Sequence, residues 1–539
     1  MSSAAPNTEQ LAAIEAPGVV FVSAGAGTGK TTVLVERYVR AVCERGLDID
    51  SILVITYTER AAGELATRIR ARLLELGRHD LARSLDGAWI STIHGFCHRL
   101  LKAHPFAAGI DPRYRVLDES QARVVQSEAF QQALTAFCAD QDPERLRLLA
   151  TYGARGLRRM VTGAFETLRS AGRPLELELA GESRLPERIE ELREAARCLL
   201  DEGHDDTAAR VLELLNASPT SEALLDLSGY AVKGRARERF ASYEEARALV
   251  ERAALDELAR RDRDLLEHLL QGFADAYRAA KDRDSALDFE DLQLYARDLL
   301  RGNEEIRERE RWRFRSIMVD EFQDTNRLQC ELVDLLAGEE LFFVGDEFQS
   351  IYRFRHADVE VFRERREQTG GVLALTENYR SRPEVLEVIN HLFSADFGTS
   401  FQPLSAAGRF PDPAFGAAVE LLVTDKSTYS DTGIHWRKAE AQHVARRLRE
   451  IVDAGEASPG EIVLLFAAGT DARLYEEELR ALGLPTLRMT GRDYYSRQQV
   501  VDLLAYLRLL QNRYDDEALV TVLASPFVGV SNDALVLLR

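Results

Sequence analysis

A glycine-rich segment near the N-terminus, SAGAGTGKTT at residues 23–32, constrains the fold of this chain more than any other feature. It lies between the apolar run VVFV (19–22) and VLVERYVRAV (33–42), whose apolar spacing is typical of a helix. A glycine turn from a strand to a helix exposes successive backbone N–H groups, and the helix dipole adds a favourable field for a phosphate. The segment therefore predicts an α/β domain with a nucleotide phosphate site.

The individual residues of this loop have expected roles. The pattern G-x-x-x-x-G-K-[ST] is met, except that Ala24 replaces the first glycine. Lys30 would reach the β- and γ-phosphates of ATP, and Thr31 would bind Mg²⁺. The rest of the expected phosphate cradle comprises Gly25, Ala26, Gly27, Thr28, Gly29 and Thr32.

An acidic pair follows a second apolar run, in IMVDEFQDTN (317–326). Phosphoryl transfer needs acidic groups that position the metal and the attacking water. Asp320 would hold Mg²⁺ through its water shell, and Glu321 would be the general base towards the water. A strand that ends in a solvated acidic turn is the alternative, and the glycine-rich loop elsewhere in the chain favours the catalytic interpretation.

Two further residues are candidates for the nucleotide site. Gln10, about twenty residues before Lys30, could read the adenine edge, but an exposed glutamine of an N-terminal helix fits the local sequence nearly as well. Arg380 in ENYRS (377–381) follows the apolar run VLAL, where a guanidinium could neutralise charge on the γ-phosphate. An ordinary surface salt bridge is the alternative for Arg380.

The stretch GDEFQSIYRFR (345–355) combines two chemistries. Its first half places an acidic pair and a glutamine after an apolar run, as in a nucleotide site. Its second half sets Tyr352 and Phe354 among Arg353 and Arg355, the mixture of rings and cations that binds single-stranded nucleic acid. Aromatic residues of such proteins are more often core residues, but the flanking arginines favour exposure.

The composition of the chain excludes some classes of protein and leaves a nucleic-acid-binding protein possible. No apolar run approaches the ~20 residues of a membrane helix, and the N-terminus lacks a basic stretch followed by an apolar one, so a cytoplasmic protein is expected. The five cysteines form no C-x-x-C pair, which argues against structural zinc and predicts buried thiols. The net charge of −20 does not exclude nucleic acid, because binding depends on the lining of a groove.

The distribution of apolar runs predicts the domain organisation. From 111 to 284 amphipathic helical patterns rich in Leu, Ala, Arg and Glu replace strand-like runs, so a helical insertion is expected. Strands of a parallel sheet are expected at 19–22, 52–56, 89–92, 316–320, 341–346 and 372–375. Strands of a second α/β domain are expected at 419–424, 461–467 and 485–489.

Seven motifs occur in an order that resembles superfamily 1 DNA helicases of the UvrD/Rep type. They are GAGTGKTT, TYTERAAGEL, STIHGFCHRLL, LDFEDL, VDEFQDTN, VGDEFQSIYRFRHA and NYRS. The form of STIHGFCHRLL, followed by RYRVLDESQA, is most similar to the RecB/AddA branch. The resemblance covers residues 10–381 specifically and weakens to a general likeness beyond 390.

The resemblance implies two RecA-like domains that use ATP and Mg²⁺ to step 3′ to 5′ along single-stranded DNA and open duplex DNA in repair and recombination. Gln349 would contact the γ-phosphate, and Tyr379 would pack on adenine. A partner subunit of a helicase–nuclease complex is left open. The residues implied to contact the tracked strand are Tyr57, His94, Tyr352, Phe354 and Arg355, and Phe354 stands where family members often have Trp.

With the resemblance, each part of the chain has an expected identity. The first RecA-like domain comprises 1–110 and 285–390, with the insertion at 111–284; an incomplete second RecA-like domain at 391–515 and the start of a helical subdomain at 516–539 follow. Two later family motifs, one with a second arginine finger, and the nuclease residues of the branch are not found, so an N-terminal part of a longer protein is expected. A non-catalytic DNA-binding module and a P-loop ATPase acting on other partners are the alternative functions.

Overall fold

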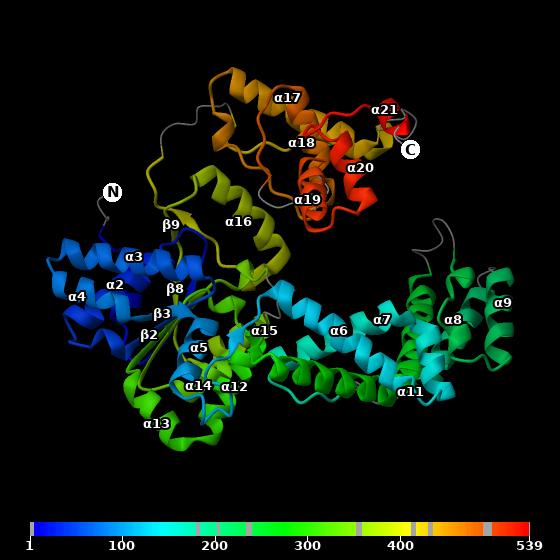
Figure 1. Cartoon of the computed structure of the whole chain (residues 1–539), viewed down its shortest axis with the longest axis horizontal. Coiled ribbons are helices and arrows are strands. Elements are labelled where there is room, and N and C mark those ends of the chain that lie inside the picture. Colours follow the sequence, from blue (N-terminus) through cyan, green and yellow to red (C-terminus); the bar gives the residue numbers. More distant parts are fainter. Residues whose placement is uncertain are drawn as a thin grey trace. The chain divides into compact units, whose positions relative to one another are not determined.

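The computed structural model of the chain (Figure 1) describes residues 5–178, 184–201, 205–232, 240–351, 358–410, 417–429, 435–488 and 498–537. The chain divides into two compact units. Unit 1 comprises Met1–Leu386 and Asn390–Arg409, and unit 2 comprises Glu387–Ile389 and Phe410–Arg539.

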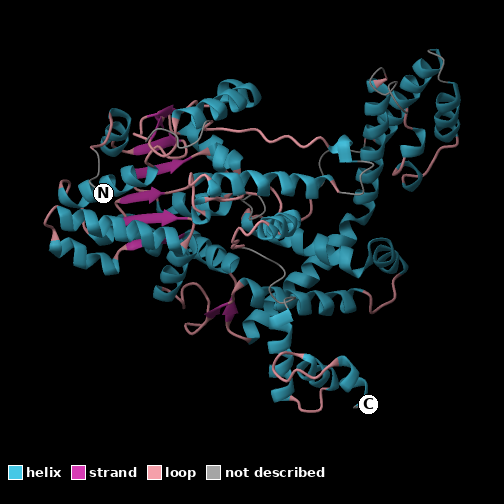
Figure 2. Cartoon of the chain, turned by 90° about the horizontal axis from the view of Figure 1, so that it is seen from above, coloured by secondary structure: helices cyan, strands magenta, loops and turns pink. Residues whose placement is uncertain are grey.

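Unit 1 is built on a six-stranded sheet whose paired strands are all parallel, seen as magenta arrows in Figure 2. The strand order is β3-β2-β6-β7-β1-β8. Their bounds are β1 Val19–Ala24, β2 Ile52–Thr56, β3 Trp89–Thr92, β6 Ser316–Val319, β7 Glu340–Gly345 and β8 Val372–Leu375. The α/β class with a parallel sheet is therefore confirmed. Because the strands are parallel, their carboxyl ends lie at one edge of the sheet, where such folds bind ligands.

Helices cover both faces of the sheet, which explains why the strands are apolar throughout. Phe21 of β1 belongs to one core and its neighbour Val22 to the other. The helices α1 (Thr8–Glu15), α2 (Lys30–Cys43), α3 (Glu59–Glu75) and α4 (His79–Ser84) contribute to the core of Val22. The helices α5 (Ile93–Ala103), α12 (Phe289–Gly302), α13 (Glu304–Arg313), α14 (Arg327–Leu336) and α15 (Val359–Gln368) contribute to the core of Phe21.

A helical segment separates the two parts of the sheet domain. It lies between the short strands β4 (Arg115–Val116) and β5 (Ala286–Leu287), which pair in parallel. Its helices are α6 (Glu119–Phe137), α7 (Pro143–Ser170), α8 (Leu185–Asp201), α9 (Asp205–Asn216) and α11 (Ala241–Arg283). Helix α11 has 43 residues and joins two cores. It is strongly charged, and no helix in the described ranges is both long and apolar enough to cross a membrane.

Unit 2 differs from the expectation for a second α/β domain. Within its described ranges it contains helices but no strand, so the strands expected at 419–424, 461–467 and 485–488 do not form. A strand needs partners for its backbone groups, and each segment has an apolar side chain that is open to solvent. Leu421, Leu465 and Leu487 are 88%, 91% and 86% exposed. The helices are α17 (Trp436–Asp453), α18 (Ala472–Ala481), α19 (Gln498–Gln511), α20 (Asp516–Ala524) and α21 (Asn532–Leu537), and α16 (Pro383–Phe397) includes residues of both units.

The cysteines are free thiols in unequal surroundings. Cys97 and Cys330 are buried, Cys43 and Cys138 are half-buried, and Cys198 is exposed. The expectation of buried thiols is therefore wrong for Cys198, which lies on the outer side of the amphipathic helix α8, where spacing alone did not place it.

Candidate nucleotide and DNA site

The glycine-rich loop connects β1 to α2 at the carboxyl edge of the sheet. Gly27 and Gly29 have φ angles of +73° and +88°, a region that side chains rarely adopt. A Cβ on Gly27 would lie 2.6 Å from the Arg380 Cβ, and one on Gly29 would lie 2.6 Å from the Gln10 Nε2. Both positions require glycine, and Thr28 closes the loop by donating from Oγ1 to the Gly25 carbonyl at 2.8 Å.

Lys30 faces the acidic pair that follows β6. Its Nζ lies 3.3 Å from the Glu321 Oε2, and its side chain is only 10% exposed. Among the described residues, neither Lys30 Nζ nor the buried Asp320 Oδ1 has a hydrogen-bond partner. Buried polar atoms without hydrogen bonds are costly, and the ion pair with Glu321 is what the Lys30 Nζ has among the described residues. These two atoms therefore suit a ligand that carries both an anion and a cation.

Three carboxyl groups near Lys30 resist ionisation. Burial and the neighbouring Glu321 raise the pKa of Asp320 to about 6, and Lys30 opposes this shift. The same causes raise the pKa of Asp324 to about 7, and burial raises the pKa of Asp346. A divalent cation would offset this crowding of negative charge, which matches the expected Mg²⁺.

A line of hydrogen bonds connects Glu321 to Gln349. The Glu321 backbone has φ +49°, and its Oε2 accepts from the Gln323 Nε2 at 2.8 Å. The Gln323 Oε1 accepts from the Asp346 backbone N–H at 2.9 Å, and Gln349 donates from Nε2 to the Asp346 Oδ2 at 2.6 Å. Sequence reasoning assigned no role to Gln323, because nothing in the local pattern reveals this link between the ends of β6 and β7.

Gln10 lies directly against the loop. Its Nε2 donates to the Thr28 carbonyl at 2.9 Å, and its Oε1 accepts from the Asn7 backbone N–H at 3.1 Å. Gln10 is 6% exposed, so the alternative of an exposed glutamine is wrong. Its amide is held by the protein on both sides.

Tyr379 and Arg380 approach the loop from the strand β9 (Glu377–Asn378). The Tyr379 backbone N–H donates to the Gly27 carbonyl at 2.9 Å. Its hydroxyl donates to the Glu377 Oε2 at 2.8 Å and accepts from the Asn7 Nδ2 at 2.9 Å, while the residue stays 41% exposed. The exposed Arg380 makes no ion pair with any described residue.

Asn378 ties these residues to the loop, a contact that the sequence did not predict. It is 1% exposed, donates from Nδ2 to the Ala26 carbonyl at 2.5 Å, and accepts at Oδ1 from the Arg380 and Ser381 backbone N–H groups at 2.8 and 2.7 Å. The hydrogen bonds of Asn7 with Glu377 and of Asn378 with Ala26 join residues about 350 to 370 positions apart in the sequence. No short sequence pattern could therefore have revealed them.

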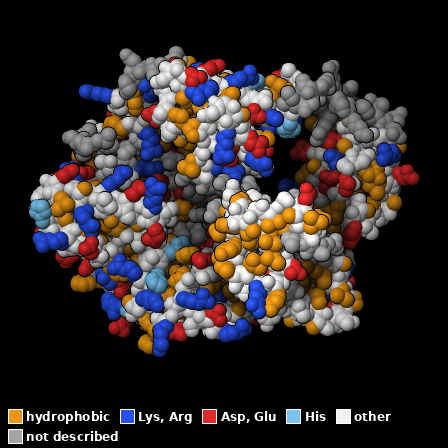
Figure 3. Space-filling view, turned by 45° about the horizontal axis from the view of Figure 1, so that its top comes forward, with side chains coloured by type: hydrophobic (Ala, Val, Ile, Leu, Met, Phe, Trp, Pro, Cys, Tyr) orange, Lys and Arg blue, Asp and Glu red, His pale blue; other side chains and the backbone are white. Residues whose placement is uncertain are grey.

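The structure describes only part of the expected DNA path. Tyr57 follows β2 and His94 begins α5, so both lie at the carboxyl edge and both are half-buried. Burial lowers the pKa of His94 to about 4, which leaves a neutral ring that meets the Phe289 ring edge-on at 5.3 Å. Tyr352, Phe354 and Arg355 lie outside the described residues. The chain has a net charge of −20, and Figure 3 shows basic side chains interspersed among acidic ones on the face that it draws.

The sheet, the glycine-rich loop and the acidic pair define a P-loop nucleotide-binding protein. Residues 6–369 match the UvrD/REP helicase N-terminal domain, and residues 373–538 match the UvrD-like helicase C-terminal domain. The chain belongs to the UvrD/REP helicase family.

Similar curated proteins are each named as one subunit of an ATP-dependent helicase/nuclease. That of Limosilactobacillus fermentum is 29% identical over 98% of this chain and 50% of the relative, and that of Geobacillus kaustophilus is 28% identical over 98% and 53%. The chain spans about half the length of the curated relatives it matches. The resemblance to the helicase/nuclease branch is confirmed.

Proposed function

We propose that the chain is the ATP-dependent motor portion of a DNA helicase that moves 3′ to 5′ on single-stranded DNA, opens duplex DNA, and acts in repair and recombination. Family membership and the names of the relatives support the helicase class. Residues 1–110 and 285–390 would form the first RecA-like domain, with the insertion at 111–284. Because residues 373–538 match the UvrD-like helicase C-terminal domain, residues 391–515 would belong to an incomplete second RecA-like domain, although its expected strands do not form in the described ranges. Residues 516–539 would begin a helical subdomain.

The Lys30–Glu321 pair at 3.3 Å carries the proposal for ATP hydrolysis. Lys30, Thr31 and the loop N–H groups would hold the phosphates, and Asp320 would hold Mg²⁺ through water. Bound Mg²⁺ would withdraw charge from the phosphate oxygens. Glu321 would accept a proton from the attacking water, and the hydrogen bond from Gln323 that holds its carboxylate within reach of Lys30 supports this role.

The other residues of the site have proposed roles that fit their positions. Gln349 would sense the γ-phosphate and pass its state through Asp346 and Gln323 to Glu321. Arg380 would offer its guanidinium to the phosphate charge, and Tyr379 would pack on adenine. Gln10 would read the adenine edge while its amide stays bonded to Thr28 and Asn7. Glu377 and Asn7 would keep the Tyr379 ring in place.

For DNA, we propose that Tyr57, His94, Tyr352, Phe354 and Arg355 line the path of the tracked strand. Base stacking suits this role because every base has a flat face. A neutral His94 would contribute a ring and not a phosphate-binding charge. The relatives are named as subunits, which supports a second protein chain as a partner.

Glu321→Gln tests the proposal. The substitution keeps shape and removes the proton acceptor, so single-stranded DNA should no longer stimulate ATP hydrolysis while mant-ATP binds as before. Lys30→Ala should weaken mant-ATP binding itself. An equal loss of mant-ATP binding in both variants would mean that Glu321 is not the base. If single-stranded DNA does not raise the rate of ATP hydrolysis in the unmodified chain, a non-catalytic DNA-binding module would be favoured.

A further inference from the structure

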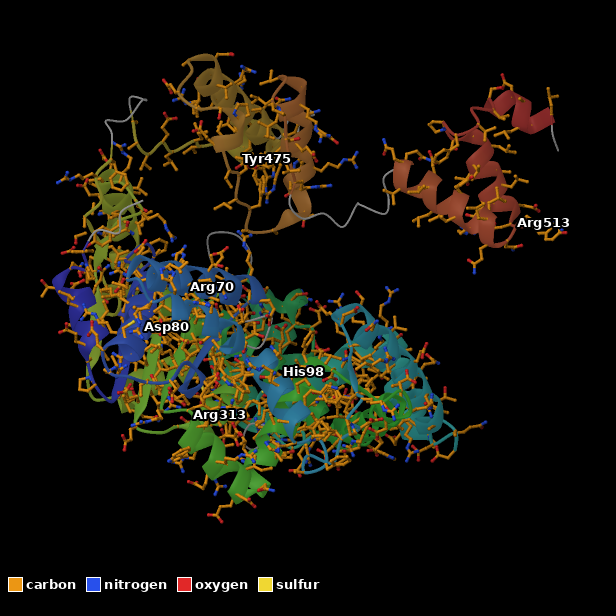
Figure 4. All side chains as sticks on the ribbon, turned by 60° about the vertical axis from the view of Figure 1, so that its left-hand side comes forward. Arg70, Asp80, His98, Arg313, Tyr475 and Arg513 are labelled. Atoms are coloured by element: carbon orange, nitrogen blue, oxygen red, sulfur yellow. The ribbon has the colours of Figure 1, made fainter. Side chains whose placement is uncertain are left out.

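A cavity of about 380 Å³ lies at the amino edge of the sheet of unit 1. Trp89 is the first residue of β3, and α13 ends just before β6 begins. Helix α5 follows β3 and returns along the sheet. All three therefore reach the edge of the sheet opposite to the glycine-rich loop. The lining residues are Trp89, His98, Arg99, Leu100, Lys102, Ala103, Glu310 and Arg313, and Figure 4 labels His98 and Arg313. None of them has a role in the nucleotide or DNA site.

The indole of Trp89 lines the cavity and contacts two guanidinium groups. The Arg99 Cζ lies 3.6 Å from the ring centroid and the Arg313 Cζ lies 4.6 Å from it. Trp89 is 6% exposed, and its Nε1 has no hydrogen-bond partner among the described residues. A buried indole N–H usually finds an acceptor, so Trp89 keeps an unused donor within the protein.

Positive charge exceeds negative charge in this cavity. Arg99 donates to the carbonyls of Ala88 and Gly87 at 2.9 and 3.2 Å, and Lys102 donates to the Pro112 carbonyl at 2.9 Å. Within the described ranges, no carboxylate forms an ion pair with Arg99 or Lys102. Burial and the nearby charge of Arg313 lower the pKa of Arg99, and Asp50 opposes this shift.

Glu310 is the single carboxylate that lines the cavity, and it is 5% exposed. Its Oε2 lies 3.7 Å from the Arg313 Nη1 and accepts no hydrogen bond from the described residues. The cavity has one carboxylate, Glu310, and three cations, so one or two further negative charges would neutralise it. The cations are Arg99, Lys102 and Arg313. Guanidinium groups match the planar fork of a carboxylate.

We infer that this cavity binds a carboxylate side chain from an acidic segment of a partner protein. Two strongly exposed rings, Trp312 at 86% and Phe106 at 85%, lie on the segments that form the cavity, next to Arg313 and just after α5. Exposed Trp and Arg side chains are the typical anchors of protein interfaces. Tracked DNA is the less suitable occupant, because Tyr57 and His94 lie at the opposite edge of the sheet.

The test measures fluorescence anisotropy of a fluorescein-labelled hexaglutamate peptide with the full chain, in the presence of excess ATP so that the glycine-rich loop is occupied. A hexaglutamine peptide and an oligothymidylate are the comparison probes. The variants are Arg313→Gln, which breaks no backbone contact, and Arg99→Gln. Arg60→Gln on α3, an exposed arginine paired with Glu64, is the matched control.

Hexaglutamate should bind to the unmodified chain, and hexaglutamine should not. Each cavity variant should weaken hexaglutamate binding by roughly tenfold or more. The hexaglutamate affinity of Arg60→Gln and the melting temperature of Arg313→Gln should equal those of the unmodified chain. Three results would overturn the inference: no binding of hexaglutamate, equal affinity in Arg313→Gln and the unmodified chain, or a loss of oligothymidylate affinity in the cavity variants that is as large as the loss for the peptide. Because the cavity lies away from the motor site, mant-ATP binding should be equal in all variants. The proposed ATPase function can therefore fail while the proposed carboxylate site in the cavity still holds.

Discussion

At the scale of single residues, the site depends on backbone conformations and buried charges that few side chains tolerate. Sequence reasoning identified Lys30, Glu321, Gln10 and Arg380, because each belongs to a short pattern with a known chemical requirement. The structure places Lys30 beside Glu321, and both Gln10 and Arg380 beside the loop glycines. The long-range contacts of Asn7, Gln323 and Asn378 could not be predicted, since they depend on the packing of distant segments.

Gly27→Ala tests the loop geometry. The new methyl group would meet Arg380 and Asn378, so mant-ATP affinity should fall roughly tenfold or more. Gly46→Ala is the matched control, because Gly46 has a similar φ of +69° but no neighbour within 4 Å. Equal affinities for the two variants would show that the close approach at Gly27 is not required for nucleotide binding.

Glu290→Gln tests a buried charge near His94, a residue of the proposed DNA path. Burial, with Asp288 and Asp291, raises the pKa of Glu290 from 4.5 to about 7, against the opposing effect of Arg169. The folded chain therefore keeps a proton that the unfolded chain loses, and stability falls as pH rises from about 4.5 to 7. Glu290→Gln should gain about 1–2 kcal/mol of unfolding free energy at pH ~8 and nothing at pH ~4.

Urea unfolding at several pH values measures this effect. Glu305→Gln, which changes an exposed carboxylate of α13, controls for the lost charge. A gain that is the same at all pH values would contradict the assignment of the shift to Glu290.

At the scale of elements, the strands of unit 1 were predictable because both faces of a parallel sheet are covered, so each strand is a continuous apolar run. The runs at 52–56, 89–92 and 372–375 coincide with β2, β3 and β8. The same pattern failed at 419–424 and 461–467, since an apolar run forms a strand only when another strand pairs with it, and local sequence does not report the partner.

Helix α1 illustrates how one element positions another. Arg37 of α2 is 1% exposed and donates to the carbonyls of Ala13, Ile14 and Ala16 at 3.0, 3.1 and 2.8 Å, which holds the end of α1. Arg37→Met should lower stability by about 2–4 kcal/mol and release Gln10 from the loop. The preference for ATP over GTP should fall, with KM for ATP rising more than kcat changes.

Arg40→Met is the control for Arg37→Met, because Arg40 lies on the same helix and pairs with the exposed Glu15 of α1. Steady-state hydrolysis with both nucleotides gives the preference. An unchanged preference in Arg37→Met, despite lower stability, would show that α1 has no role in base selection.

At the scale of the whole molecule, a buried ionic cluster joins the helical insertion to the sheet domain of unit 1. Arg169 of α7 donates to both Asp288 oxygens at 3.0 Å, and Lys281 and Tyr277 of α11 contact the same carboxylate at 3.1 and 3.0 Å. Burial alone would raise the pKa of Asp288, but Arg169 and Lys281 lower it below its usual range. Asp288 and Asp291 begin α12, so the insertion and the domain share these charges.

Asp288→Asn should destabilise the chain by about 3–5 kcal/mol, because it leaves the buried Arg169 and Lys281 with too little negative charge. Asp298→Asn, on the exposed side of α12, should cost little. Hydrogen exchange should rise first in α7 and the last turns of α11. A thermal unfolding midpoint equal to that of the unmodified chain would show that the cluster does not hold the insertion.

We propose that the nucleotide site controls the affinity for single-stranded DNA through the hydrogen bonds that connect Glu321 to Gln349. The most direct measurement is the affinity of the chain for a labelled oligothymidylate, with and without a non-hydrolysable ATP analogue and Mg²⁺. The affinity should change by roughly fivefold or more on addition of the analogue, and Gln349→Ala should remove the change while mant-ATP still binds. The same affinity with and without the analogue, in a chain that binds both ligands, would contradict the claim.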